Sequence, residues 1–289
     1  PENQKQGLVS LPLTLGGNCF IAGVSGSGKS TLLSTFILST ITSHSVDEVN
    51  FYIIDFANET LKRFSKAPQV GNVLTMDNMD KVSILLNRVE SEIKNRKKIL
   101  SKHELDYISY VRDKTLPPMP NYIVIINGFD AFREQFSDFI DEKFLSIVRE
   151  CNKYGITFII TSTDPHGLYA SHFDQFPQRI ALKFSNPDDY MDFCDSKIVP
   201  STNPGRGIKI DGKPYQFQTA LIVQENIMTN VLNQIFDQLN KIMPIKADQI
   251  PVMPDFVTID QFKDKLVNLS SIPIGYNIST INPSYYNFD

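Results

Sequence analysis

The stretch Gly23-Val24-Ser25-Gly26-Ser27-Gly28-Lys29-Ser30 decides the fold of this chain. Its spacing, Gly-x-x-x-x-Gly-Lys-Ser/Thr, is informative only between a strand and a helix. The apolar residues Cys19-Phe20-Ile21-Ala22 come directly before it, as a buried strand would, and residues 31–41 have the apolar spacing of a helix. The context is therefore that of a phosphate-binding loop in an α/β domain.

Each part of this loop predicts a contact with a bound nucleotide. The glycines let successive backbone N–H groups point at the phosphates, and the helix N-terminus adds its positive end. We expect Lys29 to reach the β- and γ-phosphates, the Ser30 hydroxyl to bind Mg²⁺ and Thr31 to lie near the α-phosphate. The predicted ligands are ATP and Mg²⁺, held by residues 23–31.

The remaining sequence predicts a mainly parallel sheet flanked by helices. Four buried strands are predicted, at 49–56, 71–74, 122–126 and 156–161. Long helices are predicted between them, at 79–105 and 139–151. Strands that alternate with helices form parallel sheets with right-handed connections. Three shorter strands predict an antiparallel or mixed edge, at 180–184, 207–210 and 216–222.

This pattern predicts an α/β P-loop NTPase domain over residues 1–225 and a C-terminal extension over 226–289. In the extension we expect one helix at 227–242 and another near 258–269, joined by proline-punctuated connecting chain.

The strand at 122–126 is where the acidic residues of a hydrolase are expected. Such enzymes hold the Mg²⁺ shell with an acid at the end of a strand, and a carboxylate beside it activates water. Here the strand is followed by Asn127 and Gly128, and the nearest acid is Asp130. A misplacement of about 1 Å can lower a rate by two orders of magnitude. We therefore expect ATP binding with weak or absent hydrolysis.

Other strand ends offer alternatives. Asp55 ends the strand at 49–56, and ligands bind beyond the carboxyl ends of parallel strands, so it is a second candidate for the missing acid. It is equally well read as a turn residue. Thr161 and Thr163 follow the strand at 156–161 and are candidates for sensing the γ-phosphate.

The composition limits the classes of partner. The chain has 289 residues, a net charge of −4 and a pI of about 5.6, which disfavours a nucleic-acid-binding domain. The basic cluster Lys94–Lys98 is read first as an exposed helix face. The three cysteines are far apart and predict buried thiols in a reducing cytoplasm. No apolar run reaches the length of a membrane span, and the chain lacks an initiating Met, so we expect it to be a piece of a longer protein.

The order of these segments resembles the FtsK/SpoIIIE ATPase family, and within it the ATPase modules of the EssC/EccC motors of type VII secretion. The resemblance covers roughly residues 8–223. It rests on the P-loop followed by the segments VNFYIIDFANETLKRF, NYIVIINGFD, GITFIITSTDP, FPQRIALKFS and NPGRGIKI. It implies several modules in series after membrane segments, of which the later ones bind ATP with degraded acidic motifs. Asn127-Gly128 in place of Asp-Glu is such a departure.

The resemblance also implies partners and a location. Arg179 would be an arginine finger acting on a neighbour's phosphates, although a structural role within its own chain is the stronger reading. Ser271–Tyr276 resembles the lead-in to a further module. The expected partners are neighbouring modules, other copies in a ring and a helical secreted protein, at the cytoplasmic face of the bacterial membrane. An active FtsK-type motor, for secretion or DNA, that uses Asp130 or Asp55 remains the alternative.

Overall fold

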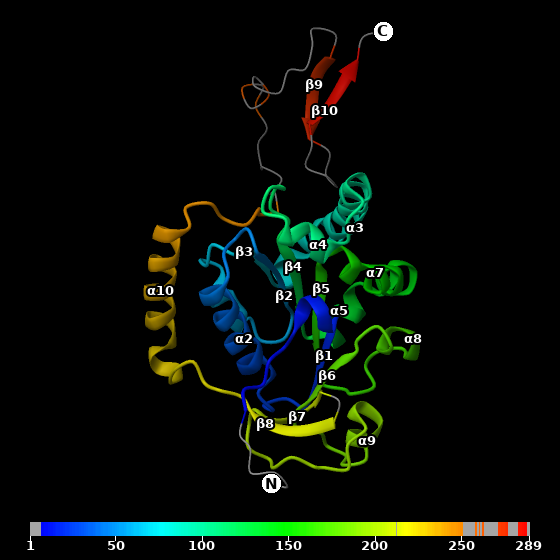
Figure 1. Cartoon of the computed structure of the whole chain (residues 1–289), viewed down its shortest axis with the longest axis vertical. Helices are drawn as coiled ribbons and strands as arrows, with labels where there is room; N and C mark the ends of the chain where they lie inside the picture. Colours follow the sequence, from blue (N-terminus) through cyan, green and yellow to red (C-terminus); the bar gives the residue numbers. More distant parts are fainter. Residues whose placement is uncertain are drawn as a thin grey trace.

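An eight-stranded sheet forms the centre of the molecule (Figure 1). The computed structural model describes residues 7–211, 213–250, 258, 260, 262, 271–276 and 283–287. The strand order is β3-β2-β4-β5-β1-β6-β7-β8. The six strands from β3 to β6 in this order are parallel, and β7 and β8 continue the sheet antiparallel. The strands are β1 Cys19–Ala22, β2 Val49–Asp55, β3 Val70–Leu74, β4 Asn121–Asn127, β5 Ile156–Ser162, β6 Gln178–Ala181, β7 Arg206–Asp211 and β8 Lys213–Gln218. The predicted fold class is therefore confirmed.

Alternate residues of the central strands face two separate cores, because successive side chains of a strand point to opposite faces. On one face, Phe20, Tyr52 and Val124 pack in a core with α3 (Met79–His103), α5 (Phe129–Gln135) and α7 (Leu145–Glu150). On the other, Ile21 and Ile53 pack in a core with α2 (Lys29–Ser43), the short helix η1 (Thr60–Phe64) and α10 (Glu225–Ile242). Every residue of β2, β4 and β5 is buried, which explains why these strands are continuous apolar runs in the sequence.

The helices and helical turns connect the strands on both faces. They are α1 Leu13–Gly16, α2 Lys29–Ser43, η1 Thr60–Phe64, η2 Met76–Asn78, α3 Met79–His103, α4 Tyr107–Arg112, α5 Phe129–Gln135, α6 Ser137–Phe139, η3 Ile140–Phe144, α7 Leu145–Glu150, η4 Cys151–Tyr154, α8 Ala170–Phe173, α9 Asp189–Cys194 and α10 Glu225–Ile242. Among the described residues, no helix is long and apolar enough to cross a membrane.

Several element boundaries differ from the sequence prediction. The helix expected at 139–151 is a run of short helical segments, from α6 through η3 and α7 to η4. The separate helix α5 before it was not predicted; Gly128 adopts φ 91° and turns the chain directly from β4 into α5. The strand expected at 216–222 is β8, Lys213–Gln218, and the chain leaves the sheet before Thr219. Helix α4 was also not predicted; Asp106 caps it by accepting a hydrogen bond from the Ser109 N–H at 2.7 Å.

The end of the chain also differs from its prediction as connecting chain. The strands β9 (Ser271–Tyr276) and β10 (Pro283–Asn287) form an antiparallel pair, which Figure 1 shows apart from the large sheet. The helix expected near 258–269 lies outside the described residues except at 258, 260 and 262. The helix expected at 227–242 is confirmed as α10, and Met228, Leu232 and Phe236 bury one side of it in the core beside α2.

The three cysteines are fully buried and free, as their spacing predicts. Burial raises the pKa of Cys19 and of Cys151 to about 12, and that of Cys194 to about 11. Only the thiolate reacts with a disulfide reagent, so the native chain should not react with dithionitrobenzoate at about pH 8. In guanidinium chloride all three thiols should react. Rapid labelling of any cysteine in the native chain would contradict this burial.

Candidate functional site

The glycine-rich loop connects the carboxyl end of β1 to α2. Gly23 N–H donates to the Ser162 carbonyl at 3.1 Å and Val24 N–H donates to the Lys183 carbonyl at 2.8 Å, so β5 and the chain after β6 hold its start. Gly26 and Gly28 adopt φ 75° and 103°, in the left-handed region that residues with a Cβ rarely adopt. A Cβ at Gly26 would meet nothing within 4 Å. The turn is thus open on the side where phosphate oxygens approach the backbone of such loops.

A second loop packs against the first. Gly205 N–H donates to the Ser27 carbonyl at 2.8 Å, and a Cβ at Gly28 would lie 2.6 Å from the Gly205 nitrogen. Gly28 is therefore required by close packing as well as by its φ angle. Gly205 immediately precedes β7, so the antiparallel edge of the sheet supports the phosphate loop. The neighbouring Arg206 side chain donates a hydrogen bond from Nε to the Gln218 side-chain oxygen at 3.1 Å. This bond joins the two edge strands, β7 and β8.

Lys29 is folded back over the loop that precedes it. Its ammonium group donates to the carbonyls of Gly23 and, at 3.1 Å, of Val24. Burial lowers the pKa of Lys29, and the negative charge of Asp130 opposes that shift. The cation is thus placed over the open turn, where phosphates would replace the two carbonyls as its partners.

The register of the sheet aligns three polar residues at one edge. Asp55 pairs with Asn127 across β2 and β4, and Asn127 pairs with Thr161 across β4 and β5. The Asn127 amide donates to the Asp55 carboxylate at 2.7 Å, and the Thr161 hydroxyl donates to the Asn127 carbonyl oxygen at 2.8 Å. All three residues are fully buried. The strand that carries Asn127 is not next to β1, since β5 lies between them.

This row of polar residues reaches the phosphate loop at Ser30. The Asn127 amide nitrogen lies 3.5 Å from the Ser30 hydroxyl, which is 3.4 Å from the Asn58 side-chain oxygen. Asp55 also accepts hydrogen bonds from the backbone N–H groups of Ala57 (3.3 Å) and Leu61 (3.0 Å), so it organises the turn before η1. These contacts confirm Asp55 as a turn residue, and its alternative role as the missing acid stays a prediction. Asn58 was missed, because nothing in the local pattern marks it.

Gly128 leaves the site without a side chain, and the local backbone also requires a glycine at this position. A Cβ at this position would lie 2.9 Å from the Ala57 nitrogen, and the backbone already has φ 91°. Its N–H donates to the Thr161 hydroxyl at 3.0 Å. A glutamate at this position would therefore strain the backbone and displace the turn after β2.

Asp130 lies on α5 and is engaged by the end of β5. Its carboxylate accepts hydrogen bonds from the Ser162 hydroxyl at 2.6 Å, the Thr163 N–H at 2.8 Å and the Thr163 hydroxyl at 2.8 Å. The structure thus brings Asp130 and Thr163 together, bonded to each other. These three bonds fix the orientation of the Asp130 carboxylate and leave about one of its four acceptor positions open.

Arg179 lies near the start of β6, paired with Phe20, whereas the phosphate loop follows the end of β1. Its guanidinium lies 3.8 Å from the centre of the Phe173 ring, and its Nε donates to the Phe176 carbonyl at 3.3 Å. Burial lowers the pKa of Arg179. These contacts hold it within its own chain, and they favour the structural role over the arginine finger.

A cavity of about 310 Å³ opens beside Ser30 and Thr31. It is lined by residues of α2, of the turn around η1 and of the segment that leads into α10: Ser30, Thr31, Ser34, Thr35, Asn58, Thr60, Arg63, Leu221, Ile222, Val223, Gln224, Glu225 and Met228. The lining residues beyond the loop come from segments far apart in the chain, so no local pattern predicts a role for them.

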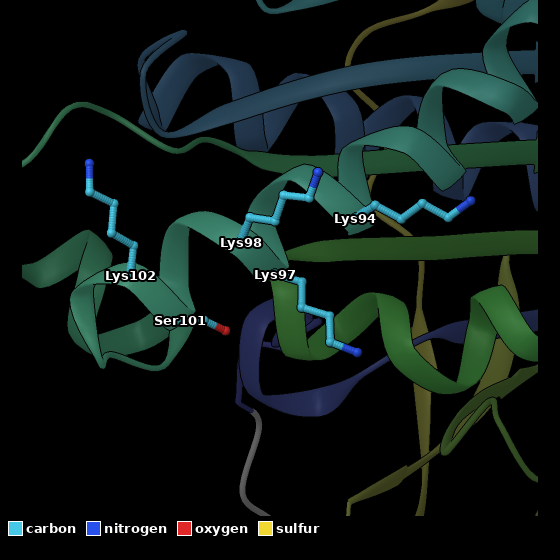
Figure 2. Close-up of a pocket in the computed structure, with 5 residues that line it drawn as sticks. All are labelled: Lys94, Lys97, Lys98, Ser101 and Lys102. Atoms are coloured by element: carbon cyan, nitrogen blue, oxygen red, sulfur yellow. The ribbon is translucent and has the colours of Figure 1, made fainter.

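The lysine cluster on α3 lies elsewhere. Its side chains line an open surface hollow and point in different directions (Figure 2): Lys94, Lys97, Lys98, Ser101 and Lys102. Arg96, on the same turns, donates to the carbonyls of Tyr154 and Gly155, directly before β5. The cluster is therefore at the amino edge of the sheet, opposite the phosphate loop.

The residues present fit Mg²⁺-bound ATP. The loop offers backbone N–H groups and a lysine, and Ser30 offers a hydroxyl with the side-chain oxygen of Asn58 at 3.4 Å. Among the described residues, no group of three or more His, Cys, Asp or Glu side chains forms a separate metal site. A phosphate loop between β1 and α2, at the carboxyl edge of a mainly parallel sheet, defines a P-loop ATPase domain. The chain belongs to the FtsK/SpoIIIE family, whose model matches residues 4–211.

Its relatives include proteins of type VII secretion systems. The chain is 25% identical over 296 residues to the ESX secretion system protein YukB of Bacillus subtilis (strain 168), an alignment that covers 99% of this chain and 20% of YukB. It is 23% identical over 286 residues to the type VII secretion system protein EssC of Staphylococcus aureus (strain NCTC 8325 / PS 47), covering 95% of this chain and 19% of EssC. The chain thus spans about a fifth of the length of these relatives.

Solved structures share the fold. EssC (ATPases 2 and 3) from Geobacillus thermodenitrificans superposes with a TM-score of 0.87 at 23% identity, over 99% of this chain and 57% of that one. Thermomonospora curvata EccC (ATPases 2 and 3), in complex with a signal sequence peptide, superposes with a TM-score of 0.84 at 23% identity, over 100% of this chain and 54% of that one.

Proposed function

We propose that this chain is an ATP-binding module of a type VII protein-secretion motor, with weak or absent hydrolysis. The observation that carries the proposal is the pairing at the end of β4. The Ser30 hydroxyl lies 3.5 Å from the amide of Asn127, where a hydrolase has a carboxylate, and Gly128 follows with no side chain. Binding needs the loop and Lys29, which are present. Turnover needs an acid and a base that these two positions do not supply.

Each residue of the site then has a defined task. Lys29 and the loop N–H groups would hold the β- and γ-phosphates, and the Ser30 hydroxyl would bind Mg²⁺, which neutralises charge on the phosphates when it is bound. The Asn58 side-chain oxygen would accept a hydrogen bond from a water around the ion, whereas Asn127 turns its amide nitrogen, a donor, toward Ser30. The negative charge of Asp55 lies behind Asn127 and would attract the cation without contacting it.

The two candidates after β4 are poorly placed to activate water. Gly128 has no side chain, and three hydrogen bonds from Ser162 and Thr163 hold the Asp130 carboxylate at the end of β5. ATP would act as a structural ligand, since a ligand that binds only the folded state stabilises it by mass action.

We further propose that the module acts with neighbouring ATPase modules of the same polypeptide, with other copies in a ring and with helical secreted proteins. Support comes from the relatives, whose structures contain several ATPases and, in one, a signal sequence peptide. The strand β9 would begin the lead-in to a following module. The motor would lie at the cytoplasmic face of the bacterial membrane, attached through parts of the polypeptide outside this sequence. The pI of about 5.6 disfavours nucleic acid as the cargo.

The test pairs calorimetry of ATP binding in Mg²⁺ with steady-state phosphate release, on the chain and on Lys29→Ala. Loss of the hydrogen bonds from Lys29 to two phosphates should weaken ATP binding about 100-fold. Lys97→Ala, on the exposed face of α3, is the matched control and should bind ATP unchanged. Phosphate release from the unmodified chain should not exceed that of Lys29→Ala.

Turnover of about 1–10³ s⁻¹, as in ordinary enzymes, that Lys29→Ala abolishes would reject weak hydrolysis and favour an active motor. Asp130→Asn and Asp55→Asn would then identify which carboxylate replaces the missing acid. Absence of ATP binding by the unmodified chain would reject the proposed function altogether.

A further inference from the structure

We propose that the cavity beside Ser30 and Thr31 is the adenosine subsite, and that its occupation fastens α10 to the P-loop domain. This inference rests on the proposed function, because it names where the base and ribose of ATP bind and what they hold in place. It makes α10 the element that responds to the nucleotide.

The cavity lies where the nucleoside must continue from the phosphates. Thr31 follows the loop at the predicted position of the α-phosphate, so the ribose and base lie beyond it. Thr35 is four residues further along α2, on the same side of the helix, and also lines the cavity. The volume of about 310 Å³ lies at the lower end of the range of small-molecule sites, about 300–1,000 Å³.

The wall opposite α2 suits a flat, partly apolar base. Leu221, Ile222 and Val223 line it, and Leu221 is 70% exposed although it is a large apolar side chain. A base packed on Leu221 would remove this apolar surface from water. The Thr35 hydroxyl donates to the Ala220 carbonyl at 2.6 Å, so α2 already fixes the start of this wall.

The same wall leads directly into α10, which begins at Glu225. Its inward side buries Met228, Leu232 and Phe236 in the core, and Ile235 and Leu239 pack against that core. Its polar ties to the η1 region join Arg63 to Glu225 at 2.9 Å and Lys66 to Asn233 at 3.1 Å, and the Glu225 side chain is 75% exposed. Exposed pairs of this kind contribute little to stability.

A ligand that bridges α2 and residues 221–225 would therefore add to the attachment of α10 at its start. The phosphates alone would not, because the loop that holds them does not include the 221–225 wall. The two parts of ATP thus have separable effects, which provides the experiment.

The experiment is hydrogen exchange of the α10 amides in the unmodified chain, with Mg²⁺ and either ATP or inorganic tripolyphosphate at matched saturation. ATP should slow hydrogen exchange at the start of α10. If detachment of α10 abolishes adenosine binding, the slowing should reach about 100-fold at an ATP concentration 100 times Kd. Tripolyphosphate should protect the loop and the start of α2 and leave α10 unchanged.

A pair of variants tests the wall itself. Leu221→Asn removes the exposed apolar surface that the base would cover without adding a charge, and should weaken ATP binding about tenfold while tripolyphosphate binding stays the same. Ile242→Asn is the matched control, since Ile242 is 77% exposed and lies about 25 Å along α10 from Glu225. It should bind both ligands as the unmodified chain does.

Equal protection of α10 by ATP and tripolyphosphate, or equal weakening of both ligands by Leu221→Asn, would overturn the inference and leave the proposed function standing. Failure of the unmodified chain to bind ATP would remove both. Since the exchange comparison uses no variant, it remains decisive even if Leu221→Asn folds poorly.

Discussion

Asn127→Asp should lower the free energy of unfolding by about 3 kcal/mol near neutral pH. The Asn127 amide donates to Asp55 at 2.7 Å, and both residues are fully buried. The substitution replaces this donor with a second carboxylate at the same distance, so the two charges repel each other in a site without solvent. Urea unfolding followed by circular dichroism measures the loss.

The loss should depend on pH and on Mg²⁺. Repulsion raises the pKa of the carboxyl pair above its unfolded value, so the folded variant binds a proton that the unfolded chain has lost. The variant should thus approach the unmodified chain in stability as the pH falls toward that of free carboxylic acids, and lose stability as the pH rises. Mg²⁺ with ATP should stabilise the variant more than the unmodified chain, because a cation at Ser30 would lie beside the added charge.

Asn186→Asp is the control for this variant. The Asn186 amide also donates to an aspartate, Asp189 at 3.3 Å, but Asn186 is exposed. Water screens the new repulsion there, so the change should stay within about 0.5 kcal/mol. Similar losses in both variants would show that burial does not strengthen the repulsion. A response to Mg²⁺ and ATP no larger than that of the unmodified chain would show that Asn127 does not lie beside the cation site.

Arg96→Met should destabilise the chain by about 3–5 kcal/mol. Arg96 is 1% exposed, and its Nε bonds Glu92 at 2.8 Å. Its Nη1 donates to the carbonyls of Tyr154 (2.9 Å) and Gly155 (3.1 Å), and its guanidinium lies 4.3 Å from the centre of the Tyr122 ring. Methionine fills much of the volume but removes a donor from the Glu92 carboxylate and from both carbonyls.

Two variants on the same helix turn make this prediction specific. Lys97→Met also removes one positive charge, but on the exposed side of the helix. It should change the free energy of unfolding by no more than about 0.5 kcal/mol. Arg96→Lys keeps the charge but cannot reach all the acceptors at once, so its loss should be intermediate. If Arg96→Met and Lys97→Met unfold at the same urea concentration, the buried network contributes nothing measurable.

The sequence alone predicted the parts of this protein that are encoded locally. The loop from Gly23 to Ser30 requires glycines at particular backbone angles and a lysine at a fixed spacing, so its residues specify its shape. The strands β2, β4 and β5 are buried on both faces, and such strands appear as unbroken apolar runs. The fold class and the location of the phosphate loop follow from these two signals.

The tertiary structure decided what surrounds the loop. Register across β2, β4 and β5 bonds Asp55 to Asn127 and Asn127 to Thr161, residues more than thirty positions apart in the chain. The turn after β2 approaches position 128 so closely that only glycine fits there. The sequence showed only that this position has no side chain. The cavity beside Thr31 depends on the packing of α10 against α2. Such contacts join distant segments through burial and geometry, and no local pattern of residues encodes which segments will meet.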